Sequence, residues 1–164
     1  MGMPDSLNPR FGNNFIDANF FDCTRTDEDA AVDQILKWAD DLDEDLSLLL
    51  PYSVKAEIEH PNTPPEVKRK ATQLIYSCEV ELTAPERATH AKIAALIQGN
   101  AKAGQHAKDA FHLVESAKNG GRHFVTNDQR LLKKAPEIWD ALQIKVLKPS
   151  DFVTSWLAHK GQHA

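Results

Sequence analysis

The amino-acid sequence predicts an α/β fold, a three-layer α/β/α sandwich with a mostly parallel central sheet. Short apolar segments of strand length alternate with longer segments of helical periodicity, the pattern of βαβ units. One of the apolar segments is a continuous run, as in strands that helices cover on both faces. The length of 164 residues suits one hydrophobic core. We expect a flexible lead-in at 1–13, a single domain at 14–158 and a tail at 159–164.

Strand and helix patterns alternate through the first half of the chain. Ala31, Ile35 and Trp38 recur at helical spacing behind an acidic first turn. The apolar run 46–50 indicates a buried strand. Pro51 suits the first turn of the next helix, because an N–H there would have no helical partner. The elements expected here are strands at 15–16, 46–50 and 80–82, and helices at 27–41, from Pro51 onward, and at 64–77.

The second half repeats the alternation with clearer start and stop signals. Thr83 and Glu86 have the spacing of a capping box, which starts a helix. Asn119-Gly120-Gly121 is typical of a helix end. The elements expected here are helices at 84–98 and 105–118, from Asp128 onward and at 149–159, and strands at 123–126 and 144–147.

Composition excludes some classes of protein and favours others. Apolar residues make up 41% and charged residues 26%, the profile of a folded globular chain. No apolar run approaches the roughly 18 residues that a membrane span needs. No secretory signal opens the sequence, and Cys23 and Cys78 are too far apart for a metal motif. We therefore expect a cytoplasmic protein with two free thiols and no membrane association.

The net charge of −5 is unevenly divided along the chain. Residues 1–83 carry 7 lysines and arginines against 17 acids, whereas residues 84–164 carry 12 against 7. Such a division is compatible with a polyanion lying along one side of the molecule. The basic side chains that could line a phosphate path are Lys102, Lys108, Arg122, Arg130, Lys133 and Lys134. Arg122 and Arg130 are favoured because they flank Asp128.

Three acids follow predicted strands. Asp17 comes directly after the first strand and Asp128 directly after the strand 123–126. Glu57 lies within two turns of the carboxyl end of the strand 46–50. Because ligands of open α/β sheets bind beyond the carboxyl ends of the strands, these acids are expected at one edge.

A fourth acid, Asp109, lies on the helix 105–118. At 100° per residue it falls about 40° beyond the apolar arc of that helix, at the core boundary. Glu115 and Lys108 are expected on its solvated face. His112, one turn from Asp109, could touch the site, but a packed or solvated histidine is the expected role.

Gathered carboxylates repel one another unless a cation lies between them, so the cluster itself predicts a metal ion. Mg²⁺ prefers oxygen ligands, and such ions activate water for attack on phosphate. Each acid alone has a structural alternative. Asp17 and Asp128 could be helix caps, Glu57 a solvated helix residue like Glu59, and Asp109 a surface acid.

Four segments of the chain together resemble the motifs of PIN domains. They are Phe15-Ile16-Asp17-Ala18-Asn19, Val54-Lys55-Ala56-Glu57-Ile58, Asp109-Ala110-Phe111-His112-Leu113-Val114 and Phe124-Val125-Thr126-Asn127-Asp128. Their order and spacing agree over about residues 14–158. The third and fourth are the most specific, and the second is loose.

This resemblance implies a parallel α/β/α nuclease that uses Mg²⁺ or Mn²⁺ to hydrolyse RNA. Asp17, Glu57, Asp109 and Asp128 would be the metal-binding and catalytic residues. Asn19, Thr126 and Asn127 would be supporting polar groups. Many bacterial PIN domains of this size are VapC-like toxins, usually homodimers inhibited by a partner antitoxin. The resemblance therefore implies a second copy of this chain and an antitoxin protein as partners, besides the RNA substrate.

Two alternatives stay open at this point. The first is a catalytically silent PIN fold that binds RNA or a protein. The second is a phosphoryl-handling domain of the receiver or haloacid-dehalogenase kind, which also places acids after strands. The segment Asp17-Ala18-Asn19 lacks the second Asp of the dehalogenase pattern, and the strand 123–126 is followed by Asn127 and Asp128 rather than by a lysine.

Overall fold

Five parallel strands form the centre of the molecule in a computed structural model that describes residues 3–4, 7–22, 27–102 and 106–160. The strand order is β3-β2-β1-β4-β5, which places the first strand of the chain in the middle. The pairs β1–β2, β1–β4, β2–β3 and β4–β5 are all parallel. The strands are β1 (Asn13–Ile16), β2 (Leu48–Leu50), β3 (Ile75–Tyr76), β4 (Gly121–Val125) and β5 (Lys145–Leu147).

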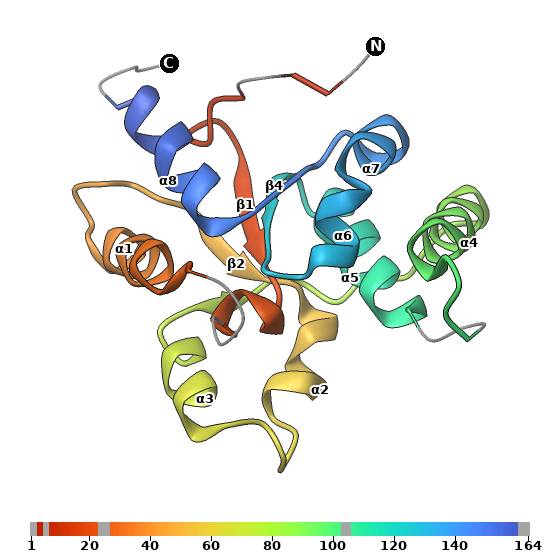
Figure 1. The fold of residues 1–164 in the computed structure, drawn as a ribbon, viewed down its shortest axis with the longest axis horizontal. Helices are drawn as coiled ribbons and strands as arrows, with labels where there is room; N and C mark the ends of the chain where they lie inside the picture. Colours follow the sequence, from red (N-terminus) through yellow and green to blue (C-terminus); the bar gives the residue numbers. More distant parts are fainter. Residues whose placement is uncertain (1–2, 5–6, 23–26, 103–105, 161–164) are drawn as a thin grey trace.

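Helices follow the strands and cover both faces of the sheet (Figure 1). This arrangement is the predicted three-layer α/β/α architecture. The α-helices are α1 (Asp29–Asp40), α2 (Lys55–Ile58), α3 (Pro65–Ala71), α4 (Ala84–Gln98), α5 (Ala107–Lys118), α6 (Gln129–Lys133), α7 (Ala135–Leu142) and α8 (Pro149–Ala158). The described residues also form two 3₁₀ helices. One is η1 (Ala18–Phe21), which Asp17 separates from β1, and the other is η2 (Tyr52–Val54), directly before α2.

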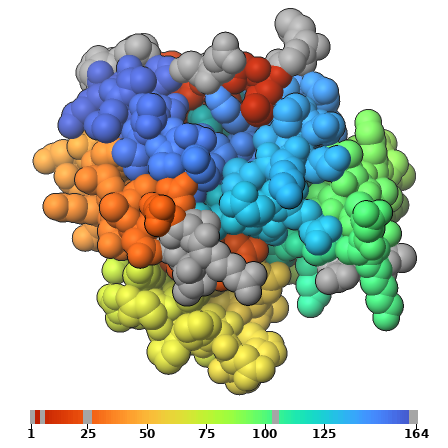
Figure 2. Space-filling model, in the orientation of Figure 1, coloured from red at the N-terminus to blue at the C-terminus, as the bar shows by residue number. Residues whose placement is uncertain are grey.

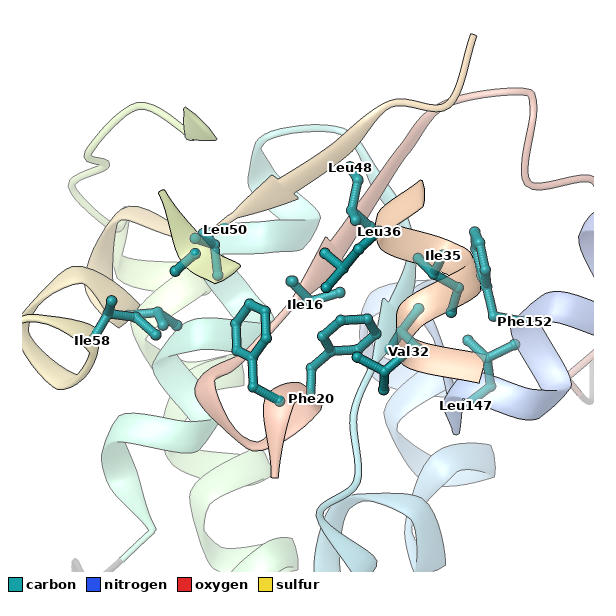
Figure 3. Packing of buried hydrophobic residues seen from close by; sticks show 14 of the residues in the cluster. Ile16, Phe20, Val32, Ile35, Leu36, Leu48, Leu50, Ile58, Leu147 and Phe152 are labelled. Carbon is teal, nitrogen blue, oxygen red and sulfur yellow. The ribbon is translucent and has the colours of Figure 1, made fainter. Parts of the chain in front are cut away.

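The pleat of the central strands divides the hydrophobic core into two layers. Successive side chains of a strand point to opposite faces, so Ile16 and Val125 join one cluster while Phe15 and Phe124 join the other. The first cluster packs against η1, α1 and α8 (Figure 3). The second packs against α4, α5 and α7. Because helices cover both faces of the sheet, we expect a ligand to bind beyond the carboxyl ends of the strands.

The predicted lead-in at residues 1–13 is in part bound to the rest of the chain. Strand β1 already begins at Asn13. The guanidinium of Arg10 lies 4.0 Å above the ring of Trp156 in α8, and Arg10 pairs with Glu44. Ser155 of α8 donates a hydrogen bond to the carbonyl of Leu7. The segment from Leu7 onward is therefore packed against α8.

The region between α3 and α4 differs from the prediction. Helix α3 ends at Ala71 rather than at 77, and the strand β3 follows it within the predicted helix. The predicted strand at 80–82 is wrong, since those residues form no strand or helix. β-branched Ile75 and aromatic Tyr76 suit a strand, and pairing with Leu49 and Leu50 of β2 overrides the helical pattern before them.

No helix among the described residues is long and apolar enough to cross a membrane. Cys78 is a free, exposed thiol, whereas Cys23 lies outside the described residues.

Candidate metal-binding site

The sheet brings the acids together because its two central strands end side by side. Phe15 pairs with Phe124 and Ile16 with Val125, so β1 and β4 deliver the residues that follow them to the same edge. Asp17 comes next after β1, and Thr126, Asn127 and Asp128 come next after β4. In Figure 1 the strands point toward the region where η1, α2 and α6 begin.

Asp17 is a buried carboxylate that caps a helix and faces the cluster. It is 3% exposed. One oxygen accepts a hydrogen bond of 3.0 Å from the N–H of Phe20 in η1, and the other accepts one of 2.8 Å from the hydroxyl of Thr126. Burial raises the pKa of Asp17 from 3.8 to about 7 against the lowering effect of Thr126, and the charges of Asp128 and Asp109 add to the rise.

Asp128 is tied to Asp17 through Thr126. Its N–H donates to the Thr126 hydroxyl at 3.0 Å, the same hydroxyl that donates to Asp17. One Asp128 oxygen accepts from the N–H of Arg130 at 2.9 Å and so caps α6. The other lies 3.5 Å from the amide nitrogen of Asn19. Capping and membership of the cluster are thus compatible roles for one side chain.

Asp109 of α5 and Glu57 of α2 lie beside His112, and Asp109 is near enough to Asp17 and Asp128 for their charges to act on one another. Asp109 lies at the boundary of the core, as the helical pattern predicts, with its side chain 24% exposed. Burial raises the pKa of Asp109, and the charges of Asp128 and Glu57 raise it further, while His106 and His112 lower it. Ligand atoms of Glu57, Asp109 and His112 all lie within 4.8 Å of one another.

His112 is both packed and part of the site. It is 2% exposed. Its Nε2 atom lies 2.9 Å from a Glu57 oxygen, and its Nδ1 atom lies 2.6 Å from the hydroxyl of Ser53 in η2. The sequence pattern allowed His112 to touch the site but favoured a packed or solvated ring. The three-residue spacing between Asp109 and His112, about one helical turn, was the feature of the sequence that indicated a place for His112 in the site.

The prediction that Glu115 lies on the solvated face of α5 is wrong. It is fully buried, whereas Lys108 is exposed as predicted. One Glu115 oxygen accepts a hydrogen bond of 2.7 Å from the N–H of Ser53. The other has no hydrogen-bond partner among the described residues. A helical wheel predicts burial from apolar side chains only, and here a carboxylate is buried against a backbone N–H of η2.

The site has an excess of negative charge. Among the ion pairs of the described residues, none joins Asp17, Glu57, Asp109 or Asp128 to a lysine or arginine, and the only partners are His106 and His112. Carboxylates and imidazole are metal ligands. The partly buried group of Glu57, Asp109 and His112 can therefore hold a metal ion.

The three supporting residues differ in their contacts. Thr126 is fully buried and bridges Asp17 and Asp128. Asn19 is exposed and approaches Asp128. Asn127 donates to the carbonyl of Phe20 and so ties the end of β4 to η1.

The two favoured arginines lie at opposite ends of the sheet. Arg130 is exposed beside Asp128, and its guanidinium donates to the carbonyl of Gln98 at the end of α4. Arg122 is the second residue of β4 and lies near Gly12, at the amino end of the strand. At about 3.3 Å per residue, it is more than ~10 Å along the strand from Thr126. The structure does not bring Arg122 to the acids.

No protein-family model matches this chain, and a search of curated proteins finds no match. The resemblance to PIN domains therefore rests on the four sequence motifs.

Proposed function

We propose that this chain is a metal-dependent endoribonuclease of the PIN-domain type that hydrolyses RNA phosphodiester bonds with Mg²⁺ or Mn²⁺. One observation supports this function above the others. Asp17, Glu57, Asp109 and Asp128 come from four different parts of the chain; the charges of Asp128 and Asp109 raise the pKa of Asp17, and those of Asp128 and Glu57 raise the pKa of Asp109. A cluster of this kind is unfavourable without a cation, and it lies where α/β sheets bind ligands.

A bound divalent ion would supply an activated water and would stabilise the negative charge that develops on the phosphate. The residues of the chain hold the ligands in place. The hydroxyl of Thr126 and the N–H of Phe20 fix the two oxygens of Asp17. His112 orients Glu57, and Ser53 orients His112. Such outer contacts reduce the motion that metal ligands must lose on binding.

Carboxylate oxygens suit Mg²⁺ and Mn²⁺, whereas imidazole nitrogen suits later transition metals. We expect the four carboxylates to supply the ligands, directly or through water. A panel of divalent ions would show whether His112 also binds.

The test is cleavage of a labelled single-stranded RNA in Mn²⁺. Asp17→Asn, Asp109→Asn and Asp128→Asn should each lower the rate roughly 100-fold or more, the scale of losing one group that stabilises developing charge. Circular dichroism should show an intact fold, because each change keeps the shape of the side chain. Calorimetric titration with Mn²⁺ should show weakened binding in the same variants.

Glu57 and Glu59 supply a matched pair. Glu57 faces His112, whereas Glu59 is exposed two residues further on. Glu57→Gln should reduce cleavage and Glu59→Gln should not. Equal losses in both would contradict the assigned site. If the metal-loaded protein binds RNA but never cleaves it, the catalytically silent module is the correct function.

The biological role within this proposal is that of a VapC-like toxin, homodimeric and inhibited by an antitoxin. That role rests on the sequence resemblance. A small neighbouring reading frame whose product binds this chain and blocks RNA cleavage would support it, and a product without effect on cleavage would contradict it.

A further inference from the structure

A cleft of about 680 Å³ opens directly beside the acids. Asn19, Asn127 and Asp128 of the site line one end of it. The other side is built by the end of α4 and by α6 with the residue that follows it, which lie next to each other in Figure 2 (green and cyan). The cleft thus adjoins the candidate site at Asp128, whereas Glu57, Asp109 and His112 do not line it.

The cleft carries more positive than negative side chains. Arg130, Lys133 and Lys134 line it, against Asp22 and Asp128. The three cations belong to α6 and the turn that ends it, whereas Asp128 caps the start of α6. The cleft therefore places lysines one to two helical turns from a carboxylate of the candidate site.

The three cations differ in how firmly they are held. The Arg130 guanidinium donates to the carbonyl of Gln98 at 3.1 Å, which fixes it to the C-terminal end of α4. Lys133 is exposed and Lys134 half-buried. Flexible lysine side chains act as point charges toward phosphate. Arg130 is therefore part of the wall, and the lysines are the groups available to a polyanion.

We propose that this cleft binds the sugar–phosphate backbone of a single-stranded RNA, with Lys133 and Lys134 contacting phosphates next to the bond held at the carboxylates. This inference rests on the proposed function, and it names the strand that the site receives. The volume of the cleft lies within the range of about 300–1,000 Å³ that is usual for small-ligand sites. A short stretch of one strand fits such a space, and a duplex does not.

The binding should depend on a divalent ion. Asp22 and Asp128 face the cleft together with the phosphates that would enter it. These carboxylates and the incoming phosphates are both negative and repel one another unless a cation lies between them. We expect Ca²⁺, which prefers the same oxygen ligands, to strengthen RNA binding.

The binding should also tolerate different base sequences. No aromatic side chain of the described residues lines the cleft, whose apolar wall is Leu96 and Ile97. These residues offer no platform for base stacking, so contacts to phosphate dominate. Such binding is independent of sequence and weakens steeply with salt.

The experiment is a fluorescence-anisotropy titration of a short labelled single-stranded RNA in Ca²⁺ at several salt concentrations. A gel confirms that the probe stays intact. Lys133→Gln/Lys134→Gln should weaken binding about tenfold at moderate salt. It should also reduce the slope of log affinity against log salt by about 0.7 for each phosphate that a lysine no longer neutralises.

The matched control is Lys37→Gln/Arg122→Gln, which removes two exposed charges on α1 and at the amino end of β4. It should bind RNA as the wild type does. Circular dichroism checks both variants, and the single variant Lys133→Gln serves if the double variant unfolds. Equal weakening by test and control, an unchanged salt slope, or equal binding of a duplex RNA would overturn the inference.

The two proposals fail in distinguishable ways. If the wild type cleaves RNA but the lysine variant binds it unchanged, the cleft assignment fails and the nuclease stands. If Ca²⁺-dependent binding through the lysines is observed and no RNA is cleaved in Mg²⁺ or Mn²⁺, the nuclease fails and the cleft stands.

Discussion

Asp17 illustrates how the charge of a candidate metal-binding side chain can be unfavourable for stability. Its carboxyl is buried, and burial disfavours the charged form. Two donors, Phe20 and Thr126, offset only part of that cost, so the pKa of Asp17 stays at about 7. A metal ion would supply the positive charge that the surrounding residues do not.

The pKa of Asp17 predicts how its replacement changes stability. Because the folded-state value of about 7 lies above the unfolded value of 3.8, ionisation of Asp17 destabilises the fold as pH rises between the two. Asp17→Asn should therefore stabilise the metal-free protein at about pH 8. The increase should be at most ~4 kcal/mol, since one pKa unit corresponds to about 1.4 kcal/mol. It should vanish below about pH 4.

Urea denaturation in EDTA measures this difference. Asp140→Asn on α7 is the control, because Asp140 is exposed and outside the site. Addition of Mn²⁺ should reverse the order, stabilising the wild type more than Asp17→Asn. A variant that is less stable than the wild type at about pH 8 without metal would contradict the cost assigned to the buried carboxylate.

At the scale of the elements, strand ends were predictable and long-range pairings were not. Asp17 and Asp128 could be placed at one edge from the sequence, since each follows an apolar strand and parallel strands share an edge. Both acids do lie at one edge, but the sequence did not predict that β1 and β4 are neighbours, which is what brings the acids together. Strand β3 could not be predicted, because its two residues, Ile75 and Tyr76, owe their conformation to pairing with β2 rather than to a local pattern.

The α2–α5 contact was also outside the reach of the sequence. Glu57 was the least supported of the four acids, yet its place beside His112 is set by residues far apart in the chain. Ser53 is 59 residues from His112 and 62 from Glu115, and both hydrogen bonds join η2 to α5. Sequence periodicity describes one helix at a time and contains no information about such a partner.

This contact leads to a prediction for Ser53. Its hydroxyl holds the Nδ1 atom of His112, whose Nε2 atom faces Glu57. Ser53→Ala should weaken Mn²⁺ binding by about 10-fold, the lower end of the effect of removing a hydrogen bond behind a metal ligand, because Ser53 acts on Glu57 through His112. The N–H of Ser53 and its bond to Glu115 remain in the variant, so the fold should persist.

Isothermal titration of the metal-free protein with Mn²⁺ provides the measurement. Ser155→Ala is the matched control, because Ser155 donates a comparable bond to the Leu7 carbonyl, away from the acids. If both serine variants bind Mn²⁺ equally well, His112 does not depend on Ser53 for its orientation.

At the scale of the whole molecule, two buried groups make the stability depend on pH in opposite directions. His123 of β4 is fully buried and packs edge-to-face on Phe152 of α8 at 5.7 Å. Burial lowers the pKa of His123 to about 3, and the charges of Lys145 and Arg122 lower it further. It lies on the α8 side of the sheet, and Asp17 lies at the carboxyl edge.

The sign for His123 is opposite to that for Asp17. Below about pH 6.5 the unfolded chain binds a proton at this histidine that the folded chain refuses, so stability falls as pH decreases toward the folded value of about 3. Between about pH 4 and 6.5 the two groups partly cancel. Asp17 lowers stability as pH rises, and His123 raises it.

His123→Leu should therefore gain stability relative to the wild type as the pH falls, by at most ~3 kcal/mol between about pH 7 and pH 4, on top of a difference that does not depend on pH. The stability of Asp17→Asn relative to the wild type has the reverse pH dependence, because it increases as the pH rises. Urea denaturation of the wild type, both single variants and the double variant across this range tests both signs. Because the two sites are separate, the double variant should show the sum of the two differences. A His123→Leu variant whose stability relative to the wild type is independent of pH would show that protonation of His123 does not limit the fold in acid.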